Sequence, residues 1–137
     1  MSSRWTCPAC GRTFGRTGQG HLCVPVRTLD EFFAAQPAKL RDVFEAVVDH
    51  MSQLEDVILE PGDSYLMLKR DRKFAALTAR RRWVRMWFIL PYTVEDERIQ
   101  SHTRATDGGV AHFVQLRGSD DVDDTVRGWL TESYDAF

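Results

Sequence analysis

The stretch YLMLKRDRKFAALTARRRWVRMWFIL, Tyr65 to Leu90, decides the fold of this chain. It contains the β-prone runs YLMLK, KFAALTA and WVRMWFIL, which are separated by short charged turns and ended by Pro91. A fourth run, DVILE, precedes it across the turn at 60–63. Because these four runs follow one another at short spacing, we expect an antiparallel meander. A further strand, HFVQLRG, is expected after the Gly108–Gly109 pair.

Helical patterns lie on both sides of the meander. Thr28 with Glu31 three residues later predicts a capping box that opens the short helix LDEFFAAQ. Pro37 fits the first turn of a second helix, whose apolar residues recur on one stripe. Ser119 is expected to cap a last helix, with a run of aspartates at its N-terminal end. The sequence therefore predicts an α+β domain, an antiparallel sheet of about four to five strands with helices on one face.

All three cysteines lie between Trp5 and Cys23, in WTCPACGRTFGRTGQGHLC. The spacing Cys7-x2-Cys10 followed by His21-x-Cys23 is typical of a Cys3His zinc knuckle, in which Gly11 lets the chain turn beneath the ion. Four protein ligands leave no position for water, so we expect a structural Zn2+. The alternatives are a redox pair, which needs a surrounding βαβ unit, and cysteines that bind no metal.

We therefore divide the chain into a zinc knuckle over 1–27 and an α+β domain over 28–137. The whole chain has 137 residues, 43% hydrophobic and 28% charged, which is ordinary for one globular domain with a small appendage. No apolar run is long enough to span a membrane, and the N-terminus has no signal-peptide core. A cytoplasmic protein with no membrane partner is the expectation.

The net charge of −2 hides a strongly basic tract. Between positions 69 and 85 eight cationic residues face one acid, Asp71, which gives a local charge of +7. Alternation along the strands places aromatic and cationic side chains together on one sheet face. On such a face nucleobases can stack on the aromatic rings while the cations contact the phosphate backbone. The residues predicted to bind nucleic acid or another polyanion are Lys69, Arg70, Arg72, Lys73, Arg80, Arg81, Arg82, Trp83, Arg85 and Trp87.

Two alternatives remain open at this stage. In the first, the aromatic face is covered by the knuckle, by the short helix or by a second copy of the chain, and the protein is an interaction or homodimerisation module. An enzyme acting on a small anionic substrate is the third hypothesis, with His102, Asp107 and His112 as acid–base candidates. Enzyme signatures such as a nucleophile elbow or a phosphate-binding glycine loop are absent from the sequence.

The chain also resembles a known family. CPACGRTF…HLC, LDEFFAAQPAKLRDVFEAVVDHM, YLMLKRDRKFAALTARRRWVRMWFILP and VQLRGSDDVDDTVRGWLTESY are similar to the bacterial domain of unknown function 5655, in its form with an N-terminal zinc knuckle. The resemblance extends over nearly the whole chain and implies no catalytic residues. Some members resemble appendages of nuclease-type or DNA-restriction proteins, which by analogy alone favours nucleic acid as the ligand.

Overall fold

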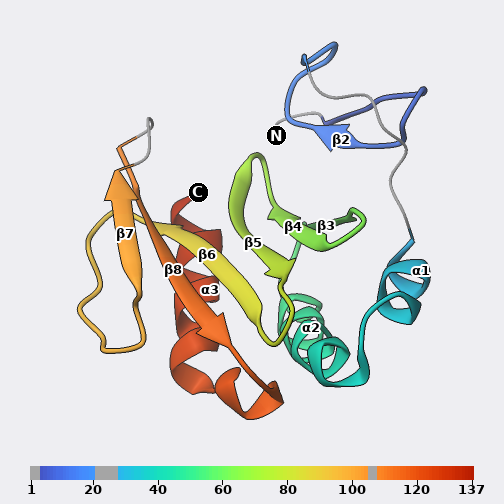
Figure 1. The fold of residues 1–137 in the computed structure, drawn as a ribbon. Helices are drawn as coiled ribbons and strands as arrows, with labels where there is room; N and C mark the ends of the chain where they lie inside the picture. The colour runs from blue at the N-terminus through green and yellow to red at the C-terminus, as the bar shows by residue number, and fades with distance from the viewer. Residues whose placement is uncertain (1–3, 21–27, 105–107) are drawn as a thin grey trace.

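The computed structural model describes residues 4–20, 28–104 and 108–137. A two-stranded N-terminal hairpin is followed by two helices, six strands and a C-terminal helix (Figure 1). The elements are β1 (Trp5–Thr6), β2 (Thr13–Phe14), α1 (Leu29–Ala34), α2 (Ala38–Met51), β3 (Ile58–Pro61), β4 (Tyr65–Lys69), β5 (Lys73–Ala79), β6 (Val84–Leu90), β7 (Ser101–Arg104), β8 (Val110–Leu116), the 3-10 turn η1 (Ser119–Asp121) and α3 (Asp124–Ala136).

The main sheet is antiparallel throughout and has the order β3-β4-β5-β6-β8-β7. The predicted α+β class is thus confirmed, and all five expected strands are present. The sheet nevertheless has six strands rather than four to five, because β7 was not predicted. Its four side chains are polar and exposed, so it carries no alternation of apolar and polar residues for sequence analysis to detect.

The core lies between one face of the sheet and the helices α2 and α3, and we call this face of the sheet the inner face. Phe88 of β6 stacks on Trp129 of α3, with ring centroids 5.1 Å apart and planes inclined by 14°. Phe44 of α2 meets Phe32 of α1 edge to face at 4.7 Å. All four rings belong to one hydrophobic cluster, which joins the three helices to the sheet.

The predicted N-terminal cap of α1 is confirmed, and that of α3 is corrected. Thr28 caps α1 as predicted: its hydroxyl accepts the Glu31 N–H at 3.1 Å, and the Glu31 carboxylate accepts the Thr28 N–H in return. The expectation that Ser119 caps the last helix was wrong. Ser119 begins the short 3-10 turn, and the cap of α3 is Asp123, whose carboxylate accepts the Val126 N–H at 3.0 Å. This contact lowers the pKa of Asp123.

Across the described ranges, no helix has both the length and the apolar character that crossing a membrane requires.

Candidate functional site

The N-terminal hairpin places Cys7 and Cys10 on one tight turn. Both thiols are buried, the Gly11 N–H donates to the Cys7 carbonyl at 2.8 Å, and the Cys7 N–H donates to the Arg12 carbonyl at 2.8 Å. Gly11 has a φ of 79°, the left-handed conformation expected of the glycine in a knuckle turn. Two thiols gathered on one turn fit one half of a tetrahedral zinc site.

The other two predicted ligands, His21 and Cys23, lie outside the described residues. Within the part of the chain that is described, no group of three or more potential metal ligands occurs. The zinc site thus stays a prediction, supported by the turn that brings Cys7 and Cys10 together.

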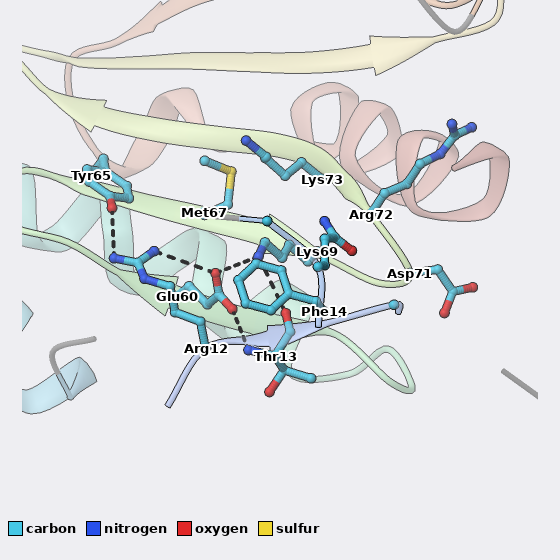
Figure 2. Close-up of a pocket in the computed structure, with 13 residues that line it drawn as sticks. Arg12, Thr13, Phe14, Glu60, Tyr65, Met67, Lys69, Asp71, Arg72 and Lys73 are labelled. Atoms are coloured by element: carbon cyan, nitrogen blue, oxygen red, sulfur yellow. Dashed lines mark hydrogen bonds and ion pairs between the residues drawn. The ribbon is translucent and has the colours of Figure 1, made fainter. Parts of the chain in front are cut away.

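The hairpin docks on the face of the sheet that the helices leave uncovered, which we call the outer face. Glu60 of β3 is the centre of this contact (Figure 2). Its carboxylate lies 2.7 Å from the Lys69 ammonium and 3.9 Å from the Arg12 guanidinium, and it accepts the Thr13 N–H at 3.1 Å. The Arg12 guanidinium also donates to the Tyr65 hydroxyl at 3.4 Å. Backbone and side chains of the hairpin thus converge on a single acid of the sheet.

Lys69 belongs to this docking contact rather than to an exposed basic surface. It is 8% exposed, its ammonium lies 4.6 Å from the centroid of the Phe14 ring, and it donates to the Thr13 carbonyl at 3.5 Å. A cation engaged in this way has few donors left for a polyanion. We therefore leave Lys69 out of the surface proposed below.

The β4–β5 turn packs against the C-terminal end of α3. The guanidinium of Arg70 lies 4.5 Å from the centroid of Tyr134, and that of Arg72 lies 5.3 Å from the centroid of Phe137. Cations are favourable at this end of a helix because the backbone dipole is negative there. Arg70 is half-buried in this contact, whereas Arg72 and Lys73, at the start of β5, are exposed.

Arg80, Arg81 and Arg82 form the β5–β6 turn, and all three are exposed. This turn lies at the opposite end of β5 from Lys73, because consecutive antiparallel strands connect at alternate ends of a sheet. A seven-residue strand is roughly 20 Å long, so the +7 tract divides into two separate basic regions. Sequence analysis had placed both regions around one face without separating them.

Trp83, Arg85 and Trp87 share the outer face, as strand alternation predicted, and each is half-buried. The Arg85 guanidinium lies 4.4 Å from the centroid of Phe113 on β8. Another guanidinium, that of Arg117, lies 5.2 Å from the centroid of Trp83.

Phe113 and Arg117 were not singled out from the sequence. The alternation within HFVQLRG, combined with the pairing of β6 and β8, is the signal that places them there.

The outer face is not a bare aromatic patch. Among the described residues, Tyr92 at 49% exposure is the one large hydrophobic side chain classed as exposed. The hairpin covers the β3–β4 end, and two guanidinium groups cover rings at the β6–β8 end. Homodimerisation through the aromatic side chains of this face, Trp87 among them, stays a prediction.

The two histidines proposed for acid–base catalysis lie in different environments. His112 is fully buried, stacks on Phe88 at 5.1 Å, and its Nε2 accepts the Val94 N–H at 2.9 Å. Burial lowers the pKa of His112. His102 is exposed on β7, with its ring centroid 6.2 Å from that of His112, and Asp107 lies outside the described residues.

Two clefts of the described structure bear on where a ligand could bind. One, of about 370 Å³, lies between the hairpin and the outer face and is lined by the cations Arg12, Lys69, Arg72 and Lys73 and the acids Glu60 and Asp71 (Figure 2). The other, of about 280 Å³, lies beside α3 near Arg98 and Trp129. Neither is lined by His102 or His112.

Comparison with known proteins identifies the family of the chain. A family described as a domain of unknown function (DUF5655) matches residues 29–136, and the chain belongs to this family. The N-terminal hairpin lies outside the matched residues. No curated protein and no solved structure matched the chain.

Proposed function

We propose that this protein is a zinc-containing binding module that engages nucleic acid or another polyanion through the β5–β6 turn and the adjoining outer face. The observation that carries the proposal is the position of Arg80–Arg82. All three arginines of the turn are exposed, and the turn continues directly into Trp83, whose ring centroid lies 5.2 Å from the guanidinium of Arg117. Exposed cations and stacked planar groups are therefore neighbours on one surface.

The stacked guanidinium groups give this surface a preference for planar ligands. The guanidinium groups of Arg85 and Arg117 lie 4.4 Å and 5.2 Å from the ring centroids of Phe113 and Trp83, and these contacts reduce the side-chain freedom that binding would cost. The outer side of a guanidinium plane stacks on nucleobases, as aromatic rings do. We expect single strands to bind more tightly than duplexes, because only unpaired bases can lie flat on this face.

The turn arginines supply the contacts to phosphate. Each phosphate neutralised on a single strand releases counterions and contributes roughly 0.7 to the slope of log K against log salt. Arg80, Arg81 and Arg82 would then account for a slope of about 2. Such contacts give affinity and position without sequence specificity.

The zinc ion proposed for Cys7, Cys10, His21 and Cys23 has a structural role. Bound zinc would supply the stability that a short glycine-rich hairpin cannot obtain from its own small core. That core, among the described residues, consists of the two cysteines and Phe14 with Trp5 packed against them. The ion would act on ligand binding only through the fold of the hairpin.

The test is fluorescence anisotropy with labelled single- and double-stranded DNA and RNA between about 50 and 200 mM salt. The variant is the double substitution Arg81→Gln and Arg82→Gln. Its matched control is Lys39→Gln with Arg104→Gln, which removes the same charge from exposed positions on α2 and β7.

We expect the turn variant to weaken binding and to lower the salt slope by about 1.4, while the control keeps the wild-type slope. Equal losses in the two variants would mean that net charge alone governs binding, which contradicts the proposed surface. Absence of binding to every nucleic acid at low salt would end the nucleic-acid proposal.

A further inference from the structure

We propose that the cleft between the hairpin and the outer face is a second anion site, which takes the phosphate of a nucleoside 5′-phosphate. Its proposed phosphate ligand, Lys73, lies at the other end of β5 from Arg80–Arg82, so the two anion contacts are separate. Its walls come from the hairpin, β3, β4 and the start of β5 (Figure 2).

The pairing of two lysines carries the argument. Lys69 and Lys73 are directly opposite each other on β4 and β5, next to a register shift. Like charges directly opposite on neighbouring strands destabilise a sheet. The pair is therefore unfavourable unless negative charge lies close to both ammonium groups.

The acids of the cleft do not supply that charge to Lys73. Glu60 lies 2.7 Å from Lys69 and is further engaged by the hairpin. The Asp71 carboxylate lies 3.8 Å from Arg4. Among the described residues, the side-chain ammonium of Lys73 has neither an ion-pair nor a hydrogen-bond partner. It is the cation of this cleft that an incoming anion would neutralise.

The size and lining of the cleft favour a nucleotide over a bare ion. Its volume of about 370 Å³ falls within the range of small-molecule sites. Met67 and Tyr65 form an apolar part of the wall beside the lysines. An apolar wall next to cations suits a ring that carries a phosphate, and lysine binds phosphate as a point charge.

The experiment is a nitrogen-15 NMR titration of the full zinc-loaded chain with adenosine 5′-monophosphate, adenosine and inorganic phosphate. We expect saturable shifts at the amides of Thr13, Met67 and Lys73 with the nucleotide, and weaker binding of adenosine. Lys73→Gln should reduce nucleotide affinity about tenfold, the usual loss for a contact to a charged group. The control, Lys39→Gln, removes one charge from an exposed position on α2 and should keep the affinity within about twofold.

Absence of saturable shifts at these amides, equal binding of adenosine, or unchanged affinity in Lys73→Gln would overturn the inference.

A 5′-phosphorylated oligonucleotide compared with its 5′-hydroxyl form distinguishes the end of a nucleic acid from a free nucleotide as the source of the phosphate. The two proposals fail separately. If oligonucleotide binding depended on Arg81 and Arg82 while no saturable nucleotide shifts appeared at the cleft, the first proposal would stand without this one. If nucleotide binding depended on Lys73 while no oligonucleotide bound, this proposal would stand without the first.

Discussion

Glu60 on β3 and Lys69 on β4 form an ion pair of 2.7 Å whose side chains are 5% and 10% exposed. The pair lies beneath the N-terminal hairpin, since the Glu60 carboxylate also accepts the Thr13 N–H and the Lys69 ammonium lies over Phe14. A buried ion pair is tolerated only when further hydrogen bonds satisfy its members, and here the hairpin provides them. The hairpin and the sheet thus share one buried electrostatic contact.

Removing the acid of this pair should release the hairpin. Glu60→Gln leaves the Lys69 ammonium buried without a carboxylate, and we expect a loss of about 3 kcal/mol from the free energy that holds the hairpin on the sheet. Hydrogen exchange at the Thr13 amide measures it directly, because that amide donates to Glu60. The expected result is faster exchange at Thr13 with little change at core amides of β6.

Two further variants test the cause. Glu97→Gln removes an exposed carboxylate and should leave Thr13 exchange unchanged. Glu60→Leu combined with Lys69→Met replaces both charges by apolar groups and should recover part of the loss. Because leucine cannot accept the Thr13 N–H, docking of this variant is measured by limited proteolysis within 4–20. If the double variant were as damaging as Glu60→Gln, an unpaired buried charge would not be the cause.

A glycine in the hairpin makes a second contact on which docking depends. A Cβ atom at Gly15 would lie 2.9 Å from the carbonyl oxygen of Asp71, which is backbone and cannot swing away. Gly15→Ala should therefore push the hairpin from the β4–β5 turn, at a cost of about 1–3 kcal/mol, the usual range for overpacking. Limited proteolysis within 4–20 is the readout.

The same hairpin offers a matched control. Among the described residues, a Cβ at Gly20 would meet nothing within 4 Å, and Gly20 is not one of the residues with positive φ. Gly20→Ala should leave the cleavage rate close to wild type. Equal cleavage of the two variants would show that the close approach of Gly15 to Asp71 does not hold the hairpin in place.

The local patterns of the sequence were enough for most of the fold. Alternation in β4 and β6 and the capping box at Thr28 depend on neighbouring residues, so the class, five strands and the start of α1 followed from them. The cap of α3 was misplaced because Ser119 and Asp123 both have side chains that can cap, and only the backbone shows that a 3-10 turn separates them.

The candidate site depended more on tertiary contacts and was predicted less well. Trp83, Arg85 and Trp87 were correctly placed on one face because alternation alone decides it. The burial of Lys69 could not be predicted, because its partner Glu60 belongs to a strand end that looks like part of a turn. The separation of Lys73 from Arg80–Arg82 follows from the meander itself and was available from the sequence.

Loss of one zinc ligand should affect the hairpin and spare the core. Elemental analysis of the purified chain is expected to find about one zinc per molecule, and Cys10→Ser should lower that occupancy strongly. The far-UV circular dichroism of the helices should persist, because the large core cluster contains no residue of the hairpin. Exchange at Thr13 should rise as it does in Glu60→Gln, since the hairpin is lost from the sheet in both cases.

The contrasting outcomes are informative. A zinc-free wild-type chain with full protection at Thr13 would show that the hairpin holds its shape without metal. Cooperative unfolding of α2 and α3 in Cys10→Ser would show that the hairpin and the core fold as one unit, contrary to the division at residue 27.

One buried and one half-buried histidine, His112 and His50, should make stability fall as the solution becomes mildly acidic. Burial lowers the pKa of His112 and of His50, whose Nε2 lies 2.9 Å from the Thr131 hydroxyl. Below about pH 6.5 the unfolded chain binds protons that the folded chain does not, so the free energy of unfolding decreases as pH falls from 6.5. Above that pH these two groups add no slope.

Urea denaturation at intervals from pH 5.0 to 7.5 measures the effect. Each histidine contributes a slope of up to about 1.4 kcal/mol per pH unit, and His112→Gln should remove one such contribution while Gln retains a hydrogen-bond acceptor for the Val94 N–H. His50→Gln should remove the other, and the double variant should show little slope above pH 5. A wild-type stability that is flat between pH 5 and 6.5 would mean that both imidazoles take up protons in the folded chain as readily as in the unfolded one, and that their burial has no energetic consequence.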